Sequence, residues 1–290
     1  MLAMARAGVK KPVLSCALES CCMPRDITTA VLANTGLGHG NWLLEFGAPE
    51  MAATMRPAQF FMIGIPGAAT LLRRPYSVCG LPGTFDDRPA GALQVLYKTI
   101  GRGTGLLASL AAGAPITVLG PLGNGFNPPD DPETVPVFVA GGIGSAPFPA
   151  LTCSLADRYP RPRMIYGARS SGDLVLSDWF AERTEFEATT EDGSTGTPGR
   201  LTGPLVRMLD DEKQRKLKLY VCGPEPMLQA VGKLAVEHEV ECELSLEAHM
   251  ACGFGVCLGC VVPVRRAGDA VGYDRVCLEG PVMDARCMAW

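Results

Sequence analysis

Short apolar stretches separated by Gly- and Pro-rich turns fill the first part of the chain, after a poorly patterned arm at residues 1–24. Stretches of this length and composition are typical of β-strands. They cover 27–33, 41–46, 59–65, 92–100 and 116–119. Several short strands at close spacing predict a small antiparallel barrel, which we place at residues 25–128. The run FNPPDDPE at 126–133 is rich in proline and acidic residues and predicts a linker.

After the linker the pattern changes to strands that alternate with helices. The apolar run VPVFVA at 135–140 is typical of a strand that is buried on both faces of a parallel sheet. Further strands are predicted at 163–166, 185–190 and 218–222, and helices at about 146–157, 174–182, 202–209 and 226–237. This alternation predicts a doubly wound parallel domain at residues 129–239. A small C-terminal domain at 240–290 completes the predicted fold class, a β-barrel plus α/β.

Composition and charge give no indication that the chain binds nucleic acid or a membrane. The chain has 290 residues, of which 47% are hydrophobic and 19% charged, and its formal net charge is −4. No long run of one sign points to nucleic acid or to an anionic membrane surface. No stretch reaches the roughly 18 apolar residues of a membrane span, and the apolar run near the N-terminus is too short and interrupted to predict export. We expect a cytoplasmic protein, because a reducing compartment suits the cysteines described next.

Cysteines near the C-terminus carry the most specific chemical signal. Cys252, Cys257 and Cys260 lie in the run MACGFGVCLGC, and Cys277 follows at a distance. This C-x4-C-x2-C spacing with a distant fourth cysteine is the plant-type ligand set of a [2Fe–2S] cluster, and the intervening glycines allow the loop to turn tightly. A structural zinc site, which more often has two C-x2-C pairs, and a pair of disulfides are the alternatives. The scattered remaining cysteines, expected to be free thiols, are Cys16, Cys21, Cys22, Cys79, Cys153, Cys222, Cys242 and Cys287.

Two runs in the predicted barrel are candidates for cofactor binding. The first is Arg74, Pro75, Tyr76 and Ser77; the second, YKTIGRGT, begins at Tyr97 and ends at Gly103 and Thr104. We expect a helix to begin near residue 105, so that the preceding amides and hydroxyl would meet phosphate oxygens, because helix N-termini favour anions. Taken alone, the first run is a weak signal that also fits a surface arginine beside a strand tyrosine, and an ordinary Gly-rich turn is the alternative for the second.

Two further runs follow predicted strands of the α/β domain. The glycine loop GGIG at 141–144 lies between a buried strand and a helix, which is the context of a phosphate-binding loop. The run CGP at 222–224 ends a later strand, at the sheet edge where open α/β sheets bind ligands. Cys222 also fits a buried core thiol. The candidate nucleotide-binding residues are Gly141, Gly142, Gly144, Gly223 and Pro224.

Taken together, the barrel, the α/β unit and the cysteine loop resemble the ferredoxin–NADP reductase superfamily. From about residue 25 onward the chain is most similar to the electron-transfer subunits of two-subunit, NAD-dependent dihydroorotate dehydrogenases (class 1B). The matching pieces are PAQF at 57–60, RRPYS at 73–77, GPLGNGF at 120–126, GGIG, EDGS at 191–194, CGP, MACGFGVCLGC and VCLEGPV at 276–282. That family usually has glycine where Ala58 stands, so we expect a perturbed turn there.

The resemblance implies roles for single residues. Arg74 would pair with the pyrophosphate of FAD, Tyr76 would pack on the isoalloxazine ring and Ser77 would hydrogen-bond to flavin N5, the atom that accepts hydride. Cys222 would stand near the nicotinamide ring, so Ser77 and Cys222 are the candidate catalytic residues. The residues implied for the adenosine side are Tyr166, Gly167, Arg169 and Asp192.

The implied activity belongs to de novo pyrimidine (UMP) biosynthesis. Electrons from dihydroorotate, taken up by FMN in a partner catalytic subunit, would pass through the [2Fe–2S] cluster and FAD of this chain to NAD+. The FMN-binding catalytic subunit is the expected partner, in a heterotetramer. Two alternatives stay open: the small subunit of a ferredoxin-coupled NAD(P)H oxidoreductase, and a redox-sensing module supported only by the adjacent Cys21 and Cys22.

Overall fold

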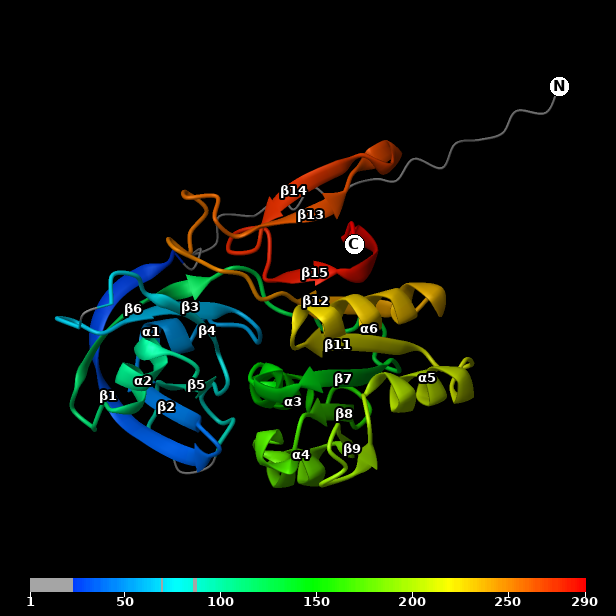
Figure 1. The fold of residues 1–290 in the computed structure, drawn as a ribbon, viewed down its shortest axis with the longest axis horizontal. Coiled ribbons are helices and arrows are strands. Elements are labelled where there is room, and N and C mark those ends of the chain that lie inside the picture. Colours follow the sequence, from blue (N-terminus) through cyan, green and yellow to red (C-terminus); the bar gives the residue numbers. More distant parts are fainter. Residues whose placement is uncertain (1–22, 69, 86–87) are drawn as a thin grey trace.

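The computed structural model describes residues 23–68, 70–85 and 88–290. Nearly all of the expected N-terminal arm, with Cys16, Cys21 and Cys22, lies outside the described residues. Figure 1 shows an antiparallel barrel (blue to green) beside a second, mainly parallel sheet covered by helices, with the C-terminal segment (orange to red) running along both. Within the described residues, no helix has the length and apolar character needed to cross a membrane.

The barrel is an antiparallel sheet whose six strands have the order β4-β3-β6-β1-β2-β5. Its elements are β1 (Arg25–Gly38), β2 (Asn41–Gly47), α1 (Pro49–Ala52), β3 (Phe60–Gly64), β4 (Arg74–Ser77), β5 (Ala92–Lys98), α2 (Arg102–Ala108) and β6 (Pro115–Leu122). Alternate apolar side chains point inward, and Phe46 meets Phe61 edge to face with ring centroids 5.4 Å apart. The predicted barrel is confirmed, although α1 was not predicted.

The second sheet has seven strands in the order β10-β9-β8-β7-β11-β12-β15, all parallel except β15, which pairs antiparallel with β12. The strands are β7 (Val135–Gly141), β8 (Arg163–Ala168), β9 (Glu185–Thr190), β10 (Thr197–Pro198), β11 (Leu217–Cys222), β12 (Glu241–Ser245) and β15 (Val282–Asp284). The α-helices are α3 (Phe148–Leu155), α4 (Ser177–Arg183), α5 (Thr202–Asp211) and α6 (Glu225–Glu237). The 3-10 turns are η1 (Gly142–Ser145) and η2 (Ser171–Asp173).

Strand β7 shows why this sheet needs helices on both faces. All of its residues are buried. Val137 and Val139 pack in the cluster that contains α5 and α6, whereas Phe138 and Ala140 pack in the cluster that contains α3 and α4. Because neighbouring residues of a strand point to opposite faces, a continuous apolar run requires two covered faces. The predicted doubly wound domain is confirmed.

The C-terminal segment shares its core with both larger parts. It adds the hairpin of β13 (Val261–Arg265) and β14 (Val271–Arg275) and the 3-10 turns η3 (Ala267–Asp269) and η4 (Ala285–Cys287). Cys260 and Cys277 are buried in one apolar cluster with Met62 of the barrel and Leu244 of β12. None of the strands β12 to β15 was predicted from the sequence. The segment that carries the cysteines is therefore packed against both the barrel and the sheet.

Two local expectations concerned single turns. The helix expected to begin near residue 105 begins at Arg102, so that prediction was wrong by one turn. The Thr104 hydroxyl accepts hydrogen bonds from the amides of Ile100 and Gly101, at 2.9 and 3.1 Å, and thereby fixes the earlier start. Ala58 is fully buried at a φ of 70°, in the left-handed region where glycine is least strained.

A buried ion pair ties the linker to the parallel sheet. Lys218 on β11 lies 3.2 Å from the carboxylate of Glu243 and 2.6 Å from that of Glu241, both on β12. Glu243 also accepts hydrogen bonds from the backbone and side-chain amides of Asn127, at 2.9 and 2.8 Å. The Lys218 side chain is only 3% exposed, so its charge depends on these partners.

We expect Glu243→Ala to lower the free energy of unfolding by about 3–5 kcal/mol, because Glu243 is the buried carboxylate of the pair and its loss leaves the buried Lys218 charge with only the more exposed Glu241, although Glu241 is the nearer of the two. Glu241→Ala removes the half-exposed carboxylate from the same lysine and should cost no more than about 1 kcal/mol. Urea unfolding of the two variants measures this difference. Equal losses would contradict the assignment of Glu243 as the principal partner of Lys218.

Candidate functional site

Two cavities lie between the barrel and the parallel sheet. The first, which we call the barrel-side cavity, has a volume of about 800 Å³ and is lined by β4, the β5–α2 turn and the segment after β12. The second, the sheet-edge cavity, has about 710 Å³ and follows the C-terminal ends of β7, β8, β9 and β11. Lys98, Ile100, Ile143 and Glu247 line both cavities, so the two form one continuous site.

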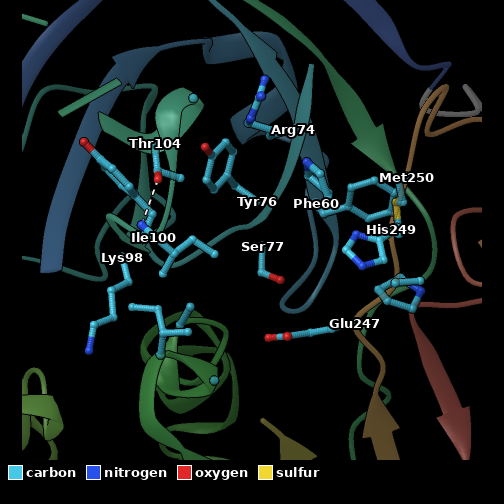
Figure 2. A pocket seen from close by; sticks show the side chains of 18 of the residues that line it. Phe60, Arg74, Tyr76, Ser77, Lys98, Ile100, Thr104, Glu247, His249 and Met250 are labelled. Carbon is cyan, nitrogen blue, oxygen red and sulfur yellow. Dashed lines mark hydrogen bonds between the residues drawn. The ribbon is translucent and has the colours of Figure 1, made fainter. Parts of the chain in front are cut away.

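The barrel-side cavity collects every candidate residue of the barrel. These are Arg74, Pro75, Tyr76, Ser77, Tyr97, Gly103 and Thr104. Figure 2 shows Arg74, Tyr76 and Ser77 along one wall. Tyr76 meets Tyr97 edge to face, with centroids 5.9 Å apart. Burial raises the pKa of Tyr76 to about 12, against the opposing effect of Arg74, so the phenol is neutral and offers an apolar ring.

Arg74 and α2 fit together only because residue 103 is glycine. A Cβ atom on Gly103 would stand 2.1 Å from Nε of Arg74. The guanidinium is held from the other side, where Nη1 donates to the Leu72 carbonyl at 2.6 Å. The Thr104 hydroxyl hydrogen-bonds to the backbone of Ile100 and Gly101. The sequence predicted that this hydroxyl would contact a phosphate, but in the structure it stabilises the start of α2.

The glycine loop and the CGP run meet where β7 and β11 end. Gly141, Gly142 and Pro224 line the sheet-edge cavity, whereas Gly144 lines the barrel-side cavity. A Cβ on Gly144 would stand 2.4 Å from the Cys222 carbonyl oxygen, and Gly142 has a φ of 52°. Gly223 lines neither cavity. It packs between Gly141 and Met227 and so lets the two runs approach each other.

Glu247 lies at the junction of the two cavities, and the neighbouring Cys222 lines the barrel-side cavity. Burial is the main cause that raises the pKa of Cys222, and the nearby Glu247 carboxylate adds to it. A hydrogen bond with Ser245 has the opposite, smaller effect, so the thiol is protonated. Glu247 is open to the barrel-side cavity, where Figure 2 shows its carboxylate on the side of Ser77. Partial desolvation by the surrounding protein raises the pKa of Glu247 above its usual value of 4.5.

Sequence reasoning missed Glu247 and Lys98. Glu247 follows β12, which pairs with β11, so Glu247 emerges beside Cys222 at the same sheet edge. Prediction of a strand at 241–245 would have supplied that signal. Lys98 ends β5 and lines both cavities. No signal in the sequence marks it apart from its place in the YKTIGRGT run.

The residues expected on the adenosine side separate into two groups. Gly167 and Arg169 line the sheet-edge cavity, but Tyr166 and Asp192 do not. Asp192 accepts hydrogen bonds from the amide and hydroxyl of Ser194, at 2.9 and 2.6 Å, while its neighbour Glu191 lines the cavity.

The four cysteines of the predicted cluster lie near one another. Cys252 interacts with Cys257, and Cys277 interacts with Cys260 and, more weakly, with Cys252. In the described part of the chain, no group of three or more His, Cys, Asp or Glu side chains is arranged to hold a metal ion. A set of four thiols close together matches the four ligands of a [2Fe–2S] cluster.

Backbone amides already point at these sulfurs. Burial raises the pKa of Cys252, but hydrogen bonds from the amides of Cys257, Phe254 and Val256 outweigh it and give a pKa of about 6. For Cys277, burial and the Cys260 thiol raise the pKa to about 12, although the Gly255 amide opposes this. The amides thus favour the thiolate form at Cys252, as an iron–sulfur site requires of its ligands, whereas at Cys277 the Gly255 amide only partly offsets burial.

The cysteine loop adjoins the barrel-side cavity. Ala251 and Gly259, which flank the first and third cysteines, line that cavity. A Cβ on Gly253 would stand 2.4 Å from Cγ of Met62 on β3, so the loop lies directly against the barrel. One cavity therefore reaches the barrel motif, the end of β11 and the cysteine loop.

Comparisons with known proteins agree with this geometry. Residues 247–288 match a family model described as the iron-sulfur cluster binding domain of dihydroorotate dehydrogenase B, and residues 138–233 match an oxidoreductase NAD-binding domain. A dihydroorotate dehydrogenase B (NAD(+)) electron transfer subunit from Desulforamulus reducens is 33% identical over 92% of this chain and 100% of its own length. The subunit from Listeria innocua is 38% identical over 81% of this chain and 88% of its own.

A solved structure adds evidence on the fold. The NADH-dependent reduced ferredoxin-NADP oxidoreductase, described in terms of flavin-based electron bifurcation, matches with a TM-score of 0.74 at 25% identity over 90% of each chain. The predicted oxidoreductase activity and the predicted cofactors FAD, [2Fe–2S] and NAD are confirmed. Identity of a third or more across most of both chains shows that this chain belongs to the family of electron transfer subunits of NAD(+)-dependent dihydroorotate dehydrogenase B.

Proposed function

We propose that the barrel-side cavity holds FAD and that the sheet-edge cavity holds NAD(H), with their reactive ends meeting between Ser77 and Cys222. The observation that carries the proposal is the continuity of the site, because a single cavity adjoins the RPYS strand, the end of β11 and the cysteine loop. FAD supplies the conversion between hydride, which carries two electrons, and the single electrons that a [2Fe–2S] cluster accepts.

The barrel residues would bind and orient the flavin. Arg74, held against Gly103, directs its guanidinium to the pyrophosphate, and the first turn of α2 adds backbone amides. The neutral ring of Tyr76 packs on the isoalloxazine, and the Ser77 hydroxyl hydrogen-bonds at N5. The family's usual glycine at position 58 is replaced by alanine at a left-handed φ, away from these contacts.

The sheet-edge residues would bind the dinucleotide. The close approach of Gly141 and Gly144 to the residues at the end of β11, and the left-handed φ of Gly142 between them, leave backbone surface open to phosphates and nicotinamide. Cys222 stays a neutral thiol and packs near the ring. Glu247, with its raised pKa, holds a proton more readily than an exposed carboxylate and lies where both cavities join.

A catalytic partner subunit follows from the family, and we propose that it is an FMN-binding dihydroorotate dehydrogenase that docks over the cysteine loop, in a heterotetramer. Large apolar side chains surround the cysteines on the outer surface: Val256 is 73% exposed, Leu258 59%, and Phe254 and Leu278 50% each. Apolar groups gathered around a redox centre are typical of an interface. A cytoplasmic location fits this proposal because a reducing compartment preserves thiolate ligands.

Gly103→Ala tests the flavin site. The added methyl group would displace the Arg74 guanidinium, so we expect FAD affinity to fall by about 1.5–3 kcal/mol. Gly105→Ala is the matched control, since a Cβ there meets nothing within 4 Å. Flavin retention on dilution, followed by fluorescence, compares the two variants. Equal retention would argue against a flavin contact at Arg74.

Cys260→Ser tests the electron path. We expect NADH to reduce the flavin normally in stopped-flow absorbance, because the nucleotide contacts lie outside the cysteine loop, while NAD-linked dihydroorotate oxidation with the partner subunit should collapse. Cys287→Ser, an exposed thiol outside the set, should leave both activities intact. Retained FAD and a native-like melting curve are required first, because loss of a cluster can unfold its surroundings. Undiminished NAD-linked turnover in Cys260→Ser would refute the relay.

Val256→Glu tests the docking surface. A charge placed in an apolar interface should weaken assembly with the FMN-binding subunit by at least about tenfold, as measured by sedimentation of the mixed subunits. Val236→Glu, on the outer face of α6, introduces the same change on an exposed valine and should leave assembly unaltered. Parallel behaviour of the two variants would place the interface elsewhere.

A further inference from the structure

An ion pair crosses from the barrel to the parallel sheet at the junction of the two cavities. Lys98, the last residue of β5, pairs with the carboxylate of Asp173, the last residue of η2. Lys98 lines both cavities and Asp173 lines the sheet-edge cavity. The two side chains are partly exposed, at 33% and 20%, so the pair is open to exchange with a ligand.

The Asp173 side of the pair is held rigidly. The hydroxyl of Tyr166 lies 2.9 Å from the Gly142 carbonyl and 3.2 Å from the Asp173 carbonyl, and it accepts the Val175 amide at 3.1 Å. Tyr166 is fully buried, and burial raises its pKa, so the hydroxyl stays protonated. One buried hydroxyl thus fixes the Asp173 segment to the glycine loop.

The barrel side is fixed by a second contact. The amide side chain of Asn41 is 3.4 Å from the Gly172 carbonyl, and a Cβ on Gly172 would stand 2.4 Å from the His39 ring. These contacts keep the β1–β2 turn against η2. Because these contacts hold the Asp173 segment on two sides, the Lys98 side chain, with four rotatable carbon–carbon bonds, is the mobile partner of the ion pair.

We propose that Asp173 is a positioning residue that restrains Lys98 and thereby limits the affinity for the dinucleotide; this inference rests on the proposed NAD(H) site. In the proposed arrangement NAD(H) lies in the sheet-edge cavity with its nicotinamide end directed at Cys222, so its pyrophosphate lies on the sheet-edge side of the junction, where the Lys98 cation also lines the cavity. Binding then requires Lys98 to turn from the carboxylate of Asp173 to the pyrophosphate. On release the ion pair re-forms, which favours rapid exchange of NAD+ and NADH.

The test is the binding of ADP-ribose to the holoenzyme, measured by calorimetry. ADP-ribose contains the pyrophosphate and lacks the nicotinamide, so its binding is independent of electron transfer. We expect Asp173→Asn to tighten binding roughly 2- to 5-fold, by freeing Lys98 and removing a repulsive charge. Lys98→Met, which keeps the apolar stem, should weaken binding about tenfold. Asp178→Asn is the matched control: it makes the same charge change on exposed α4, outside both cavities, and should have no effect.

The double variant Asp173→Asn/Lys98→Met tests whether Asp173 acts by restraining Lys98 or only by repelling the negatively charged ligand. If Asp173 acts through Lys98, Asp173→Asn should tighten binding less in a Lys98→Met background than in the wild type. In NADH-dependent dye reduction, Lys98→Met should raise KM while leaving kcat nearly unchanged. The reason is that the contact between Lys98 and the pyrophosphate stabilises the bound substrate and the transition state equally. Binding in Asp173→Asn that is unchanged or weaker, or an equal gain in both backgrounds, would overturn the inference. Failure of the wild-type holoenzyme to bind ADP-ribose would instead overturn the proposed dinucleotide site itself.

Discussion

The apolar cluster shared by three parts of the chain is the constraint on which the site depends. Met62 and Leu122 of the barrel, Leu244 of the sheet and the buried cysteines Cys260 and Cys277 pack in one core. Packing at this density leaves little freedom for rigid-body movement. Since electron transfer requires fixed separations between its centres, the same burial that stabilises the fold also sets the geometry of the proposed relay.

A second contact region closes the opposite side of the cavities. Leu43 and Leu96 of the barrel meet Ala146 and Val175 of the sheet domain in a small apolar cluster, to which Cys79 belongs. The Lys98–Asp173 ion pair lies at the margin of this interface. At this place the barrel and the sheet domain therefore meet through apolar side chains, and the ion pair lies at the edge of that contact, where it lines the cavities.

Much of the fold followed from apolar periodicity, because its strands are short, buried and separated by turns. The strand predicted at 185–190 coincides with β9, and the strand at 218–222 differs from β11 by one residue. The barrel and sheet-edge motifs could be found because each is recognised from neighbouring residues, such as a glycine loop between a strand and a helix. Glu247 could not, since its position depends on the unpredicted pairing of β12 with β11, and the Lys98–Asp173 pair joins residues from different domains.

Asn124 links the end of the barrel to the end of the chain. Its side chain donates to the carbonyls of Glu279 and Val282 and accepts the Val282 amide, all within 3.0 Å. These contacts lie between Cys277 and β15, so one barrel side chain holds both the turn after the fourth cysteine and the edge strand of the sheet. The partners stand 155 and 158 residues apart in sequence, so a long loop of chain must close before they can meet. Order in the cysteine loop is thereby coupled to the folding of the barrel.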